Sequence, residues 1–283
     1  MTRKFNQVGI VGVGLIGGAV GQAVRRAGLA GRVFGCCRRA EAGRAAVAAG
    51  AVDECSADPA RAAAGSDLVI LATGPESIPA MAGRVAAALP AGAIVTDVAS
   101  VKSRVVAGCT EALGGRGRFV GSHPLAGSER RGVEHAAEVV LAGAVCAVTP
   151  VRSTDAAARA EVCAFWTALG LRVVELSPEE HDARLARTSH LPHLTAAALC
   201  ALTQEGDADF CASGFRDCTR VAAGDPGMWA QIALGNREAL AAELYRLARR
   251  LQGAADTLTA ADREELLRLL ETGAARRREM MRE

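Results

Sequence analysis

The segment GVGLIGG, residues 12–18, constrains the fold more than any other part of the chain. It closes the apolar run VGIVGV, which begins at Val8, and opens a stretch with helical character. Glycines spaced G-x-G-x-x-G between a strand and a helix allow a tight turn, admit a pyrophosphate close to the backbone and let the helix pack on the strand. The segment predicts a dinucleotide-binding turn, with cofactor contacts from Gly12, Gly14, Leu15, Ile16 and Gly17.

Short apolar runs alternate with alanine-rich helical stretches up to about Pro150, and one more α/β unit follows. Continuous apolar runs separated by helices indicate parallel strands covered on both faces. We expect strands at 8–13, 32–36, 67–73, 93–99, 118–123, 144–150 and 172–176. Beyond Ser177 only helices are expected. The predicted fold is α/β: an N-terminal doubly wound Rossmann-type sheet (residues 1–177) followed by an all-α C-terminal dimerisation domain (178–283).

The C-terminal helices carry an apolar stripe at helical spacing, formed by Leu240, Leu244, Leu247, Leu251 and Leu258. So small a helical domain cannot hide this stripe alone, which favours a homodimer through the C-terminal helices. Alternatively, the stripe packs against the sheet domain of its own chain.

Charge and cysteine content exclude several classes of function. Lys and Arg number 33 against 31 Asp and Glu, which is too balanced for a nucleic-acid-binding protein. The apolar stretch 8–24 is too short for a membrane span and carries six glycines. The N-terminus MTRKFNQ has no small-residue cleavage site, so we expect a cytoplasmic protein. The nine cysteines have no C-x-x-C spacing, which indicates reduced thiols and no metal site.

The second predicted strand ends without the acidic residue that commonly binds the ribose of NAD. Cys37 stands there, followed by Arg38 and Arg39. A thiol is a poor acceptor for ribose hydroxyls, whereas guanidinium groups bind a 2′-phosphate, so NADP is favoured over NAD. Alternatively, both arginines are ordinary surface charges and either cofactor is used. Thr73, at the end of the third predicted strand, completes the expected cofactor contacts.

Polar residues gather in TDVASVK (96–102), GSHPLAGSE (121–129), TSHLPHL (188–194) and GFRDCTRVAAGDPGMW (214–229). The first two lie at the carboxyl ends of predicted strands, where open α/β sheets bind ligands. His123 should therefore lie beside the nicotinamide. A neutral imidazole accepts a proton readily near neutral pH, as removal of a hydride from a carbinol carbon requires.

In this order and spacing, the segments resemble the prephenate/arogenate dehydrogenase family of tyrosine biosynthesis over nearly the whole chain. The resemblance implies NAD(P)-dependent oxidative decarboxylation of prephenate or arogenate. It also implies catalytic roles for His123 as proton acceptor and for Ser100, which hydrogen-bonds the substrate hydroxyl or the histidine. Arg220 would clamp a carboxylate, and His190, His193, Glu129, Asp217 and Trp229 would line or gate the substrate pocket.

Other interpretations of these residues stay open. Arg220 could instead pair with Asp217 or Asp225, Glu129 could be a surface residue, and Trp229 could fill the core. His135 and His181 lie outside the polar motifs, and we expect them at the surface or in satisfied interfaces. A β-hydroxyacid dehydrogenase using Lys102 as its acid/base, or a non-catalytic NADPH-binding regulator, would share the fold. The sequence does not separate prephenate from arogenate.

Overall fold

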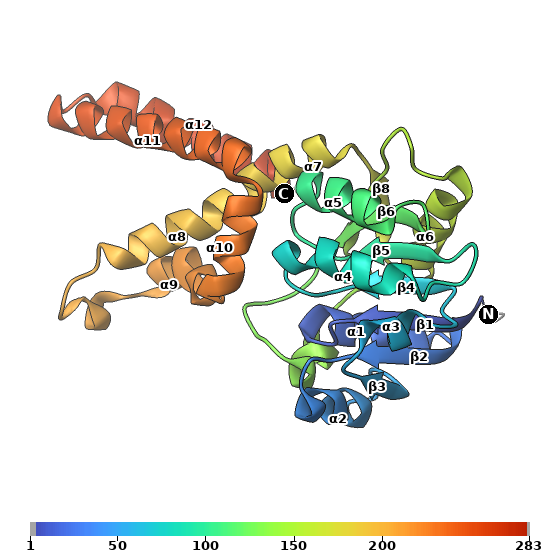
Figure 1. Cartoon of the computed structure of the whole chain (residues 1–283). Coiled ribbons are helices and arrows are strands. Elements are labelled where there is room, and N and C mark those ends of the chain that lie inside the picture. The colour runs from blue at the N-terminus through green and yellow to red at the C-terminus, as the bar shows by residue number, and fades with distance from the viewer. Residues whose placement is uncertain (1–3, 282–283) are drawn as a thin grey trace. The chain divides into compact units, whose positions relative to one another are not determined.

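The computed structural model describes residues 4–281. The N-terminal part contains an eight-stranded sheet in the order β3-β2-β1-β4-β5-β6-β7-β8 (Figure 1). The strands are β1 (Phe5–Val11), β2 (Ala30–Cys36), β3 (Glu54–Ser56), β4 (Leu68–Leu71), β5 (Ile94–Asp97), β6 (Arg118–Pro124), β7 (Val145–Thr149) and β8 (Arg172–Glu175). From β3 to β6 this is the strand order of a Rossmann fold, which confirms the predicted fold class.

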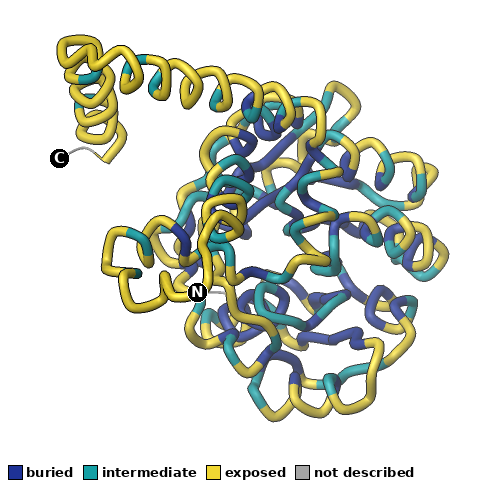
Figure 2. Tube along the Cα trace, turned by 90° about the vertical axis from the view of Figure 1, so that its left-hand side faces the viewer, coloured by how far each residue is buried: buried dark blue, intermediate teal, exposed yellow. Residues whose placement is uncertain are grey.

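Helices cover both faces of the sheet. One core lies between the sheet and α1 (Leu15–Arg26), α2 (Ala40–Ala48) and α6 (Ala156–Ala168). The second core lies under α3 (Pro59–Ala63), α4 (Ile78–Ala86) and α5 (Ser103–Leu113). The strands between β2 and β7 in the sheet are buried through most of their length, as Figure 2 shows in dark blue, whereas the edge strands β3 and β8 are only partly buried. The short helices η1 (Pro75–Ser77) and η2 (Val133–Glu138) follow β4 and β6.

Two features of the sheet differ from the sequence-based expectation, one in strand direction and one in strand number. Strand β7 runs antiparallel to β6, with His123 opposite Ala147, because an apolar run does not specify strand direction. Strand β3 was not predicted, since the tripeptide ECS has no apolar run. It pairs with β2 and extends the edge of the sheet beside the dinucleotide-binding turn.

All elements after β8 are helical. They are α7 (Pro178–Leu185), the π-helical turn η3 (Ala186–His190), α8 (Leu191–Ala201), η4 (Asp207–Phe210), α9 (Ser213–Thr219), η5 (Arg220–Ala223) and α10 (Pro226–Gly235). These belong to the same compact unit as the sheet, which extends to Asn236. The α/β part ends close to the predicted boundary after residue 177. That this boundary also separates two domains stays a prediction.

A second compact unit begins at Arg237 and consists of α11 (Arg237–Thr259) and α12 (Arg263–Met281), which contact each other. Leu251, Leu258 and Leu270 are each about three-fifths exposed, and most of both helices is exposed in Figure 2. Within residues 4–281, no helix combines the length and the apolar character needed to cross a membrane.

The glycine turn has the geometry that its spacing predicts. Gly12 has φ +98°, which favours glycine. A Cβ on Gly17 would lie 2.1 Å from the Gly12 carbonyl oxygen, so α1 packs against the turn without room for a side chain. A Cβ on Gly14, by contrast, would meet no atom within 4 Å. The first and third glycines therefore shape the turn, while the second leaves open space in front of it.

Gly17→Ala should lower the free energy of unfolding by about 1–3 kcal/mol, because the added methyl group overlaps a fixed backbone oxygen. Gly14→Ala is the matched control and should cost less than about 1 kcal/mol, as an N-cap change in open space. Urea unfolding followed by circular dichroism measures both. Equal losses in the two variants would contradict the packing role of Gly17.

Candidate active site

Three side chains form a hydrogen-bonded chain at the carboxyl end of β6. His123, on β6, places its Nδ1 atom 2.9 Å from Nε2 of His181, on α7. His181 Nδ1 lies 2.9 Å from Asp182 Oδ1. His123 is 8 % exposed and His181 is completely buried. Of the two expectations for His181, a surface position is wrong and a satisfied interface position fits: it is buried between β6 and α7 and hydrogen-bonded at both ring nitrogens, one of them to His123.

The direction of this chain fixes the tautomers of both rings. Asp182 also accepts the backbone N–H groups of Lys102 and Ser103, each at 2.8 Å, so its carboxylate acts only as an acceptor. His181 must then donate from Nδ1 to Asp182, which leaves its Nε2 as an acceptor for the Nδ1–H of His123. The Nε2 lone pair of His123 remains available for a proton.

A buried ion pair holds the backbone on which His123 stands. The Lys102 ammonium pairs with Asp97 and donates to the Ser122 carbonyl at 2.8 Å, and both side chains are completely buried. Asp97 Oδ1 accepts the Ser122 N–H at 3.1 Å. Ser122, the residue before His123, is thus bound at both its backbone N–H and its backbone C=O. Lys102 is completely buried in this ion pair, a position that argues against a role as the acid/base of a β-hydroxyacid dehydrogenase.

His190, His193 and Trp229 lie next to this chain. The π-helical turn η3 places His190 so that its Nδ1 accepts from Asn236 Nδ2 at 3.1 Å, and Asn236 also donates to the Asp182 carbonyl at 2.7 Å. The Ser100 backbone lies beside the His190 ring. His193 stacks on Trp229, with ring centroids 3.5 Å apart and planes inclined by 11°. The buried Nδ1 of His193 has no partner among the described residues.

The electrostatics of the cluster keep its imidazoles neutral. Burial, followed by the nearby His181, Lys102 and His190, holds the pKa of His123 well below its usual value. Burial lowers the pKa of His181 against the pull of Asp182, and lowers that of His190 to about 4. Burial alone would raise the pKa of Asp182, but hydrogen bonds from His181, Ser103 and Lys102 lower it. The carboxylate is therefore charged and the rings are not.

Arg220 belongs to a more exposed part of the site. Its guanidinium lies 3.2 Å from Glu129 in the loop after β6, with side-chain exposures of 64 % and 35 %. Neither Asp217 nor Asp225 is its partner: Arg131 pairs with Asp225 at 2.5 Å, and Asp225 also caps α10. Asp217 is exposed on α9. Gly224, after η5, packs against the stacked rings of Trp229 and His193. A Cβ on Gly224 would lie 2.6 Å from Trp229 and 3.1 Å from His193.

The residues present fit a bound dinucleotide. Gly14 is the N-cap of α1 and adds no capping side chain, so the first amides of the helix and the open space before them suit a pyrophosphate. Leu15, Ile16 and Gly17 form the first turn of α1. Thr73, after β4, bonds to Ser77 at 2.8 Å. Arg38 and Arg39 are exposed between β2 and α2.

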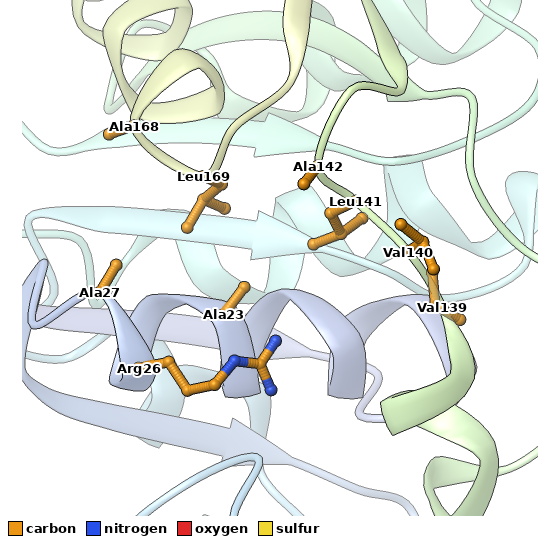
Figure 3. Close-up of a pocket in the computed structure, with 9 residues that line it drawn as sticks. All are labelled: Ala23, Arg26, Ala27, Val139, Val140, Leu141, Ala142, Ala168 and Leu169. Carbon is orange, nitrogen blue, oxygen red and sulfur yellow. The ribbon is translucent and has the colours of Figure 1, made fainter.

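Metal ligands and cavities are the remaining features that could mark a binding site. Within residues 4–281, no three His, Cys, Asp or Glu side chains are grouped to hold a metal ion. A hollow of about 410 Å³ lies at the C-terminal end of α1, away from the glycine turn (Figure 3). Leu141, Leu169 and neighbouring alanines and valines line it, with Arg26 at its side. Because its lining includes no residue of the histidine cluster, the hollow is separate from that cluster.

Sequence reasoning missed three members of the cluster: His181, Asp182 and Asn236. His181 and Asp182 lie in the run PEEHDARL, which looks like an exposed helix start because Ser177 and Glu180 form a capping box there. Asn236 terminates α10 without any motif. An acid directly after a histidine was the one available signal for the first pair.

Comparisons with known proteins identify the family of the chain. Residues 20–175 match the nucleotide-binding domain of prephenate dehydrogenase, and residues 177–272 match its dimerization domain. The prephenate dehydrogenase of Bacillus subtilis is 31% identical over 96% of this chain and 75% of its own length. The Aquifex aeolicus prephenate dehydrogenase, in complex with hydroxyphenyl propionate and NAD+, superimposes with a TM-score of 0.90 at 32% identity over 99% of both chains. Synechocystis arogenate dehydrogenase gives 0.80 at 29% identity, over 97% of this chain and 99% of its own. The chain belongs to the prephenate dehydrogenase family.

Proposed function

We propose that the protein catalyses the NAD(P)-dependent oxidative decarboxylation of prephenate, or of arogenate, in tyrosine biosynthesis. The observation that carries this proposal is the His123–His181–Asp182 chain at the end of β6, in the compact unit that also contains the glycine turn. A non-catalytic regulator would have no need of a buried histidine with an oriented, unprotonated nitrogen. The buried pairing of Lys102 argues against the β-hydroxyacid alternative.

His123 serves as the general base of this reaction. Bound NAD(P)+ supplies the acceptor for the hydride that leaves the carbinol carbon of the substrate ring. Nε2 of His123 takes the hydroxyl proton, and the adjacent His181 Nε2 accepts the Nδ1–H of the ring that becomes positive. Asp182 stabilises that charge through His181. The C–C bond to the ring carboxylate then breaks, carbon dioxide leaves, and the electron pair of that bond moves through the ring to the oxygen, which takes the proton back from His123 as the ring becomes aromatic.

Other residues bind and orient the substrate. Arg220 clamps a substrate carboxylate, because its guanidinium is exposed and already holds the carboxylate of Glu129. The substrate carboxylate then displaces the Glu129 carboxylate from Arg220, so that Glu129 acts as a gate to the pocket. Ser100 positions the substrate hydroxyl, and His190, His193 and Trp229 line the ring pocket. Asp217, which the motif GFRDCTRVA assigns to the pocket, completes the lining.

Other residues support the preferred cofactor, the assembly of the protein and its cellular compartment. Arg38 and Arg39 are exposed directly after the end of β2, and their charge suits a 2′-phosphate, which supports NADP over NAD. The exposed leucines of α11 and α12, and the match to a dimerization domain, support a homodimer through the C-terminal helices. All nine cysteines are free thiols, which supports a reducing compartment, the cytoplasm.

His123→Asn should lower kcat with prephenate by about 10²–10⁴-fold, since a general base is lost, and leave cofactor affinity unchanged. Release of carbon dioxide and formation of reduced cofactor measure turnover, with arogenate and 3-hydroxy acids as comparison substrates. The matched control is His135→Asn, at a histidine that pairs with Glu138 on the surface. Turnover of 3-hydroxy acids alone, or a loss of less than about threefold, would reject the proposal.

The pH profile of kcat/KM should show no acid limb near pH 6.5, the ordinary pKa of histidine. Catalysis needs neutral His123, so activity rises as pH increases through its pKa in the folded protein. Burial has lowered that pKa, so the rise should be complete well below pH 6.5. Initial rates with saturating cofactor between about pH 5 and 8 test this expectation. A rise centred at pH 6.5 would show that the base is solvated.

The double variant Arg38→Ser/Arg39→Ser should raise KM for NADP+ by about 10–100-fold, the effect of losing one or two charge-assisted bonds to phosphate. KM for NAD+ should change by less than about twofold, because NAD has no 2′-phosphate. Arg44→Ser, at an exposed arginine of α2 paired with Glu41, is the control. Equal changes for both cofactors would show that the arginines do not read the phosphate.

A further inference from the structure

Two cysteines lie side by side at the edge of the sheet that should receive the adenosine end of the cofactor. Cys37 directly follows β2, and Cys55 is the central residue of β3, the neighbouring strand (Figure 1). The Cys37 N–H donates to the Ser56 carbonyl at 2.9 Å. A Cβ on Gly43, in α2, would lie 3.3 Å from Cys55 Sγ and 4.0 Å from Cys37 Cβ. Both side chains therefore occupy the same small space beneath α2.

The two thiols are not equivalent. The Cys55 side chain hydrogen-bonds to the Cys37 sulfur, and the backbone N–H of Val13 does so as well. These bonds lower the pKa of Cys37 to about 7, whereas the bond to Cys37 and burial raise that of Cys55. Cys37 therefore ionises more readily than Cys55, whose thiol also contacts the Ser56 carbonyl at 3.9 Å. Burial makes the other core thiols inert, and it raises the pKa of Cys36 to about 11.

The position of Cys37 links this pair to cofactor binding. Val13 lies between Gly12 and Gly14, so the Cys37 sulfur contacts the glycine turn itself. The residue at the end of the second strand of a Rossmann fold is the one that faces the adenosine ribose. A change in the bonding of Cys37 therefore alters both the turn and the ribose site. Cys37 is 7 % exposed and Cys55 is half-buried, which leaves access for an oxidant as small as hydrogen peroxide.

We propose that Cys37 and Cys55 form a peroxide-sensitive thiol pair that lowers cofactor affinity when oxidised. The Cys37 thiolate attacks one peroxide oxygen and breaks the O–O bond, which gives a sulfenic acid and, after proton uptake, one water. The Cys55 thiol then attacks the Cys37 sulfur, the S–O bond breaks, and a second water leaves. The two thiols lose two electrons, and the peroxide gains them.

Disulfide formation moves the Cys37 sulfur from the Val13 amide towards β3. The turn loses a hydrogen bond, and the end of β2 shifts in the ribose site. Affinity for NADH or NADPH should then fall by about tenfold, as expected for one bond to a charged group. Bound cofactor should in turn slow the oxidation. The effect on affinity depends on dinucleotide binding at the glycine turn and not on the identity of the substrate.

The first test maps the bond. The full-length protein is treated with hydrogen peroxide, free thiols are blocked with N-ethylmaleimide, and digested peptides are analysed by mass spectrometry. We expect a peptide with Cys37 linked to Cys55, removed by dithiothreitol. Since Cys36 shares its peptide with Cys37, the Cys36→Ser variant should still form the link and Cys37→Ser should not. No link, or a link through Cys36, would overturn the proposal.

The second test measures affinity without turnover, so it is independent of the proposed reaction. NADH and NADPH are titrated by their fluorescence into reduced and oxidised protein. Oxidation should raise Kd about tenfold in the wild type and in Cys163→Ser, a control at another half-buried cysteine. It should leave Kd unchanged in Cys55→Ser, and Cys55→Ala provides a second variant should the first fold poorly. A mapped link without a change in Kd would overturn the effect on the cofactor.

Discussion

A closed ring of hydrogen bonds through Lys102 fixes the proposed catalytic histidine. The Lys102 side chain donates to the Ser122 carbonyl, immediately before His123, while its backbone N–H donates to Asp182. Asp182 binds His181, and His181 binds His123, which closes the ring. The loop after β5, strand β6 and helix α7 therefore share one polar network. Removal of either partner of the buried Lys102–Asp97 pair would leave an uncompensated charge, at a cost of about 3–5 kcal/mol.

The same burial that makes this network rigid gives it its chemistry. A base on the surface would titrate near pH 6.5 and would be partly protonated at neutral pH. Around His123, burial and neighbouring positive charge favour the neutral ring, while Asp182, one ring further away, retains its charge. The charge that His123 acquires has a partner at the far end of the chain. The site thus combines an unprotonated base with a fixed counter-charge.

The sequence predicted the features that depend on local spacing. The glycine turn and His123 at the end of a strand both follow from patterns within a few residues, and the order of polar motifs indicated the family. The His181–His123 contact joins residues 58 positions apart, and the Arg220–Glu129 pair joins residues 91 apart. Neither contact follows from local patterns. Helix α7, which carries His181, has the composition of an ordinary surface helix, and Glu129 and Arg220 lie in separate segments of the chain. Strand β3 was not predicted because its three half-buried residues are too few to show an alternating hydrophobic pattern.

The two ion pairs of the proposed site differ in a way that matches their roles. Lys102 and Asp97 are completely buried, so neither can exchange its partner without moving a charge into an apolar core. Arg220 and Glu129 are largely exposed, and such a pair contributes only about 0–1 kcal/mol. A substrate carboxylate replaces Glu129 on Arg220 at little cost, since one carboxylate substitutes for another. The fixed pair therefore belongs under the base, and the exchangeable pair belongs where substrate enters.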